Sequence, residues 1–270
     1  MKGTRLGRDA ERVLQYLKNA VVLAGICLAS LLGNPETTLN AGIVTTMHNL
    51  SISGPGPVKA TTEQRVCVFC HTPHGSTGNL AGINVPIWNH SLSSASYSLY
   101  SSPTLLSPTS PAIQPDGSSR LCLCCHDGTV AIGAVVNTGT AQNTISMIGT
   151  AGGGVMPAGT ANMGTDISGH HPVSIEVNTS LINDKGTQCT EGLVAWRICT
   201  PQPGIPVTLS RTNNRYGSSN NTGVGVQCTS CHDAHADPNP GTTMFLTVGD
   251  INNLDPLCLA CHLDCSLNCP

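Results

Sequence analysis

The chain has 270 residues, of which 10% are charged and 3% aromatic, and it carries 14 cysteines with a formal net charge of −3. Two tryptophans, two phenylalanines and four tyrosines are too few to fill a conventional hydrophobic core of this size. The weakly negative charge also argues against a protein that binds nucleic acid. We therefore expect a group other than side chains to supply much of the apolar volume.

The N-terminal part of the chain has the pattern of an export signal. A basic stretch precedes the apolar run AVVLAGICLASLLG at residues 20–33, which is shorter than the about 20 residues that a membrane-spanning helix needs. Ala41 offers a small residue for cleavage. The sequence predicts a signal peptide at 1–41 and a mature domain at 42–270, with an uncleaved anchor as the alternative.

The mature part repeats one five-residue pattern, Cys-x-x-Cys-His, as CVFCH, CLCCH, CTSCH and CLACH. Two thiols at this spacing can bond to the two vinyl groups at one edge of a porphyrin, and the histidine that follows lies beneath the iron. A zinc site gives no reason for a histidine after every second cysteine, and a thioredoxin-like motif would occur once. The pattern therefore predicts four covalent c-type haems. The predicted attachment residues are Cys67, Cys70, Cys122, Cys125, Cys228, Cys231, Cys258 and Cys261, and the predicted proximal iron ligands are His71, His126, His232 and His262.

Four large, rigid and apolar haems would replace the missing aromatic core and lie close enough to exchange electrons. We expect one mostly irregular domain organised by the haems, with short helices at the CxxCH motifs and few short strands. The Pro- and Ser-rich residues 101–120 and the Gly-rich residues 148–164 predict loops. β-Branched residues favour strands within 129–136 and 169–177.

Histidines outside the motifs can supply the second axial ligand of each iron. An iron held by two histidines is six-coordinate and suits electron transfer rather than the activation of a substrate. Two of these histidines follow a proximal histidine by three residues, so a helical turn would aim them past their own haem at a neighbouring one. Of the doublet before Pro172, we prefer His171 to His170, because extended backbone points the two rings apart. The candidate distal ligands are His48, His74, His90, His171 and His235.

Five further cysteines lie in the predicted mature domain. Outside the cytoplasm such cysteines favour disulfides, and the short loops favour the pairs Cys189–Cys199 and Cys265–Cys269. Cys124 lies inside CLCCH and is either a free thiol near the second haem or an intermolecular link.

The order of motifs resembles a known family. MHNLS, VCVFCHTPH and PIWNHSLSSASYSLY, then a HPVS segment, CTSCHDAH and a last CxxCH, are similar to the OmcE-like tetrahaem cytochromes that polymerise into extracellular nanowires. The resemblance covers nearly the whole predicted mature domain and is most detailed between residues 42 and 100. It implies a homopolymer with a continuous stack of haems, in which one iron takes its distal histidine from the adjacent subunit. His48 is a candidate for that ligand.

We therefore expect an electron-transfer protein and not an enzyme. The first hypothesis is a conductive filament at the cell surface that passes electrons to extracellular acceptors or redox partner proteins. A diffusible periplasmic shuttle is the alternative, and a multihaem reductase subunit comes third, because that class needs an iron with an open position. We expect no nucleic-acid partner and no stable membrane span.

Overall fold

The computed structural model describes residues 42–76, 79–80, 83–84, 87–101, 114–139, 143–177, 196–198, 201, 204–211, 224–235, 245–249 and 252–264. The chain separates into two compact units, Met1–Asn40 and Ala41–Pro270, and every described residue belongs to the second. The predicted signal peptide and the predicted disulfides Cys189–Cys199 and Cys265–Cys269 lie outside the described residues and stay predictions. Within the described ranges, no helix is long and apolar enough to cross a membrane.

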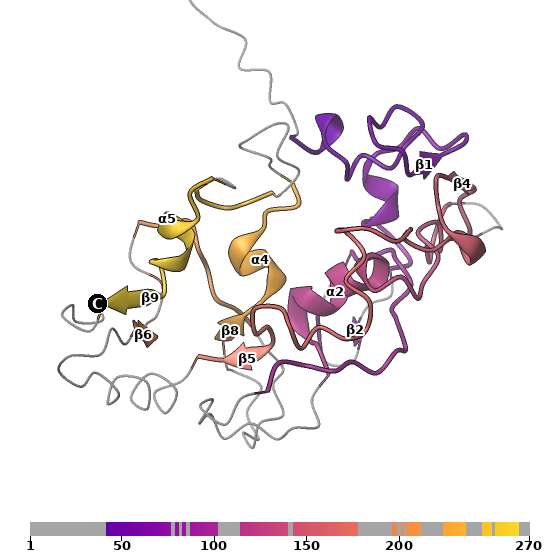
Figure 1. Ribbon diagram of the computed structural model, residues 1–270. Helices are drawn as coiled ribbons and strands as arrows, with labels where there is room; N and C mark the ends of the chain where they lie inside the picture. The colour runs from indigo at the N-terminus through magenta and orange to yellow at the C-terminus, as the bar shows by residue number, and fades with distance from the viewer. Residues whose placement is uncertain are drawn as a thin grey trace, which may run out of the picture. The chain divides into compact units, whose positions relative to one another are not determined.

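A short helix overlaps each of the four CxxCH motifs, although at the fourth motif it ends at Cys258 and His262 begins a strand (Figure 1). They are the 3-10 helix η2 (Cys67–Phe69) and the α-helices α2 (Gly117–His126), α4 (Cys228–Cys231) and α5 (Asp255–Cys258). A helical turn suits the motif because it brings residues three and four apart onto one face. The prediction of an irregular loop at 101–120 is wrong over its last four residues, since α2 begins at Gly117; residues 102–113 lie outside the description.

The remaining regular structure is sparse. The other 3-10 helices are η1 (Gly42–Thr45) and η3 (Gly152–Gly154). The strands form small antiparallel sheets. Three sheets have two strands each: β1 (Lys59–Ala60) with β4 (Met147–Ile148), β2 (Asn79–Leu80) with β3 (Ile83–Asn84), and β6 (Trp196–Ile198) with β9 (His262–Asp264). The fourth sheet has three strands in the order β5 (Ile175–Glu176), β8 (Val224–Val226) and β7 (Ser210–Arg211). The predicted strand in 169–177 corresponds to β5.

The strand predicted within 129–136 is absent from that segment, which makes only isolated bridges at Ala134 and Val135. The reason is a close backbone approach at Gly133. A Cβ atom there would lie 2.0 Å from the carbonyl oxygen of Ile145, so the two backbones pack closer than side chains permit. The chain bends at this glycine instead of continuing as a strand.

A small apolar cluster packs around the first motif. Its buried members are Ala60, Val68, Phe69, Val135 and Ile145. Val68 and Phe69 are the two residues between the cysteines of CVFCH, so the motif is anchored by its own intervening side chains. A cluster of this size agrees with the shortage of aromatic residues, and a fold organised by haem stays a proposal.

Candidate haem-binding sites

The motif cysteines are available for attachment. All nine described cysteines are free thiols, and they comprise the eight motif cysteines and Cys124. Within each motif the two thiols are therefore not joined to each other, as they would be in an oxidised dithiol site. Two free thiols on one helical turn are what thioether attachment requires.

The second and third motifs adjoin each other. Helices α2 and α4 are in contact and lie side by side (Figure 1). The Cys122 thiol donates a hydrogen bond to Cys228, which raises the pKa of Cys122 well above its ordinary value and lowers the pKa of Cys228 to about 7. The attachment residues of these two motifs therefore touch.

The other motifs also adjoin in chain order. Burial raises the pKa of the Cys125 thiol, and the nearby Cys70 of the first motif raises it further. Burial is the main cause that raises the pKa of Cys231 to about 11, and the nearby Cys261 of the fourth motif is the second cause that raises it. Each motif thus lies near the next one in the sequence.

Three histidine pairs have nearly equal separations. The ring centroids lie 6.0 Å apart for His48 and His126, 5.9 Å for His71 and His235, and 6.1 Å for His171 and His262. Two metal–nitrogen bonds of about 2 Å, together with about 1 Å from each nitrogen to its ring centre, separate two axial imidazoles by about 6 Å. Edge-to-face aromatic pairs also occur at such distances. Here, however, each pair joins one CxxCH histidine to one outside the motifs, so the residues fit an iron between them.

At the second motif, His48 has the protonation state that an iron ligand needs. Burial, followed by the neighbouring His126, lowers the pKa of His48 to about 4, so the imidazole is neutral near pH 7 and its lone pair is free to bind metal. Nδ1 of His48 is buried and has no hydrogen-bond partner within the described ranges. Nδ1 of His126 donates to the Ala161 carbonyl at 2.7 Å, which leaves Nε2 for a metal.

The pairs at the first and fourth motifs share these features. Burial lowers the pKa of both His71 and His262, and in each case the paired histidine lowers it further. Nδ1 of His71 is buried without a hydrogen-bond partner among the described residues. Nδ1 of His171 donates to the carbonyl of Pro172 at 2.9 Å, which again leaves Nε2 available.

His74 and His90 do not lie against a motif histidine, and no other ring in the described part of the chain contacts either of them. His74 is exposed, and its carbonyl accepts a hydrogen bond from Asn137 Nδ2 at 2.6 Å. His90 is 1% exposed. Its Nδ1 lies 2.8 Å from the Ser91 carbonyl and its Nε2 lies 3.5 Å from Cys125 Sγ. Their roles as distal ligands stay predictions.

Comparison with known families bears on the C-terminal part of the chain. Residues 221–265 match the family model described as the doubled CXXCH motif, a range that contains the third and fourth motifs. A doubled CXXCH motif indicates a multihaem c-type cytochrome. Motifs of this kind bind haem through thioether bonds, and the haem iron supplies one-electron chemistry. No curated protein matches this cytochrome.

A buried anion lies directly after the second motif of the cytochrome. Asp127 is 3% exposed and accepts hydrogen bonds from Tyr97 Oη at 2.5 Å and from the backbone and side chain of Thr129 at 2.8 Å. Burial alone would raise its pKa, but hydrogen bonds from Ser93, Tyr97 and Thr129 lower it, so the carboxylate stays charged beside His126. Asp127 is not among the residues predicted from the sequence, although the Asp-Gly pair after the motif is typical of a turn.

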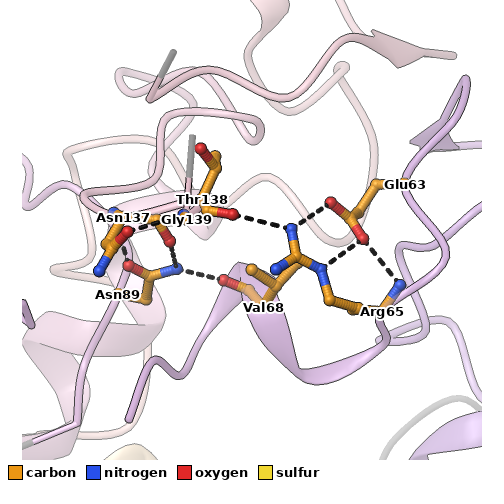
Figure 2. Close-up of polar contacts among 7 residues, drawn as sticks. All are labelled: Glu63, Arg65, Val68, Asn89, Asn137, Thr138 and Gly139. Carbon is orange, nitrogen blue, oxygen red and sulfur yellow. Dashed lines mark hydrogen bonds and ion pairs between the residues drawn. The ribbon is translucent and has the colours of Figure 1, made fainter. Parts of the chain in front are cut away.

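The first motif is held by a buried amide (Figure 2). Asn89 is 0% exposed, and its Nδ2 donates to the carbonyls of Val68 at 2.5 Å and Asn137 at 2.9 Å. Its Oδ1 accepts from the backbone N–H of Asn137 at 2.8 Å. One side chain therefore ties η2 to the chain segments at 89 and 137.

Cys124 is a buried thiol. It is 0% exposed, donates a hydrogen bond to the carbonyl of Arg120 at 3.3 Å, and has a pKa raised to about 12 by burial. A thiol in this position cannot reach a second chain, so the structure contradicts the intermolecular link and agrees with a thiol packed near the second motif.

Proposed function

We propose that this cytochrome carries electrons along a row of four bis-histidine haems, one at each CxxCH motif. The observation that carries the proposal is the set of three histidine pairs separated by 5.9 to 6.1 Å. An iron closed on both faces offers no position to a substrate, and this favours electron transfer over catalysis. The closeness of successive motifs supports electron exchange between their haems.

The proposal includes specific ligands. His235 would serve the iron of the first motif, His48 that of the second and His171 that of the fourth. His74 and His90 are then the candidates for the iron at His232. With this assignment His48 serves an iron of its own chain, in contrast to the intersubunit role that the family resemblance implies.

Electron paramagnetic resonance of the oxidised protein, combined with its intact mass, tests this function. We expect the mass of the chain plus four haems and low-spin ferric signals only, because every iron has two imidazole ligands. A high-spin signal equivalent to one iron per chain would contradict complete bis-histidine ligation and would favour the reductase subunit.

We further propose that the protein acts after export as a homopolymer, a conductive extracellular filament that delivers electrons to extracellular acceptors or partner proteins. The support is the resemblance to the OmcE-like cytochromes in the order of the motifs. Negative-stain microscopy of the purified protein at high concentration tests this directly. Filaments with a regular repeat are expected, whereas monomers alone would reject the filament and favour the diffusible periplasmic shuttle.

A further inference from the structure

We propose that Gln227 and Ser119 form a latch that positions the haem of the second motif against that of the third and so sets the rate of electron exchange between them. The inference rests on the proposed function, in which both motifs carry haem. The Gln227–Ser119 latch joins the residue just before Cys228 to the residue three positions before Cys122.

The two side chains of the latch are fully buried and hydrogen-bonded. Gln227 and Ser119 are each 0% exposed. Gln227 Oε1 accepts from the backbone N–H of Ser119 at 3.2 Å and from its hydroxyl at 2.5 Å. Gln227 Nε2 donates to Asp116 Oδ1 at 2.9 Å, and Ser119 Oγ accepts from the backbone N–H of Cys228 at 3.0 Å. The start of α2 and the start of α4 thus each donate hydrogen bonds to the other and accept hydrogen bonds from it.

Neighbouring polar groups extend the latch along both helices. The hydroxyls of Ser118 and Thr229 lie 2.6 Å apart, and Ser174 Oγ lies 3.4 Å from Gln227 Oε1. The backbone N–H of Gln227 donates to Ser230 Oγ at 3.0 Å and starts α4. A buried polar network whose members are all satisfied specifies one arrangement of its elements, because any shift leaves polar groups unpaired.

Haem attachment makes the latch more important. Each thiol adds across a vinyl group, with its hydrogen going to one carbon and its sulfur to the other. Once Cys122 and Cys228 are thioethers, neither sulfur carries a hydrogen, so the hydrogen bond between them is lost. The bonds of the latch involve no thiol and persist. They therefore hold α2 against α4 in the loaded protein, and electron exchange falls steeply when two haem edges move apart.

The test compares Gln227→Leu, Ser119→Ala and the double variant with Gln64→Leu, a control at an exposed glutamine. Intact mass and the low-spin resonance signal report haem loading and ligation. Exciton-coupled circular dichroism in the Soret band reports haem packing, and flash photoreduction reports the internal equilibration of electrons. We expect full loading and low-spin iron in every variant.

In the latch variants we expect an altered Soret exciton signal and internal equilibration slowed several-fold, with the control unchanged. The double variant should be no slower than the slower single variant, because both substitutions break one unit. A lowered melting temperature with unchanged equilibration would overturn the proposal and leave a merely structural role. If Gln227→Leu does not fold, Ser119→Ala decides, since it keeps the bond to Asp116.

Failure of the proposed function has a different signature. It would appear in the unsubstituted protein, as haem missing from the second or third motif in peptide mass analysis or as an iron with an open position. Failure of the latch alone would leave the unsubstituted protein fully loaded and low-spin, with Gln227→Leu equilibrating as fast as the control.

Discussion

The ring of His48 lies 6.0 Å from the ring of His126, with the two planes at 85°, and one face of His48 is covered by Phe245 at 4.4 Å. We predict that His48→Ala opens the iron of the second motif, because that iron loses its sixth ligand. The measurement is electron paramagnetic resonance of the ferric protein, with a new high-spin signal from one iron per chain. His48→Met is the companion variant and should stay six-coordinate with a raised reduction potential. A fully low-spin His48→Ala protein would refute the pairing.

The adjacent histidines 170 and 171 provide a matched test at the fourth motif. The ring of His171 lies 6.1 Å from that of His262, whereas the ring of His170 contacts no other ring among the described residues and its backbone N–H is bonded to the carbonyl of Ile167. We expect His171→Ala to produce a high-spin iron and His170→Ala to leave the spectrum unchanged. A fully low-spin His171→Ala protein would show that His171 does not bind that iron.

The buried amide of Asn89 should contribute measurably to stability. Asn89→Ala leaves the backbone groups of Val68 and Asn137 without their partner. An unsatisfied buried polar group costs about 1 to 3 kcal/mol, so we expect the free energy of unfolding, measured in urea, to fall by about 1 to 3 kcal/mol or more. Asn143→Ala at an exposed position is the control and should change the midpoint little. A midpoint for Asn89→Ala equal to that of the control would exclude the role.

The Glu63–Arg65 ion pair predicts that the free energy of unfolding decreases at acidic pH (Figure 2). Arg65 donates to both carboxylate oxygens, at 2.9 and 2.8 Å, and also to the carbonyl of Thr138 at 3.0 Å. The hydrogen bond from the Arg65 side chain is the main cause that lowers the pKa of Glu63 from 4.5 to about 2. Since the folded pKa is the lower one, the stabilisation is complete above pH 4.5 and disappears as the pH falls towards 2.

Urea titrations at several pH values compare the wild type with Glu63→Gln. The difference in unfolding free energy should be constant above pH 4.5 and shrink to zero near pH 2. We expect a small difference, because Arg65 is 57% exposed and water screens the pair. A difference that does not change with pH would rule out the ion pair as its source.

Cys124 should be dispensable for haem attachment. Its thiol is buried and protonated at neutral pH, with a pKa of about 12. We predict that Cys124→Ala keeps the full haem content by intact mass, whereas Cys125→Ala, one residue further on, loses a thioether bond. In the native protein, Cys124 should resist alkylation at pH 8 until urea unfolds the chain. Loss of haem from Cys124→Ala would disprove this separation of roles.

The haem-attachment residues of this protein can be predicted from its sequence because they are close neighbours in the chain. The two thiols and the proximal histidine of each motif lie within five consecutive residues, so their spacing alone defines which groups meet one edge of a porphyrin. The short helices at the motifs were predictable for the same reason. The beginning of α2 at Gly117 was not, because the local composition of residues 101–120 favours a loop and packing against α4 overrides it.

Distal ligands are a different problem, as His74 and His235 illustrate. Both follow a proximal histidine by three residues, yet only His235 lies against a motif histidine, His71. The spacing gives each ring a direction, and the path of the rest of the chain decides what it meets. The same holds for Gln227 and Ser119, whose side chains meet 108 positions apart in the sequence. The sequence by itself thus determined the attachment residues within each motif, because they are close neighbours in the chain. Only the tertiary structure decided which distant residues, such as distal histidines, lie against each motif.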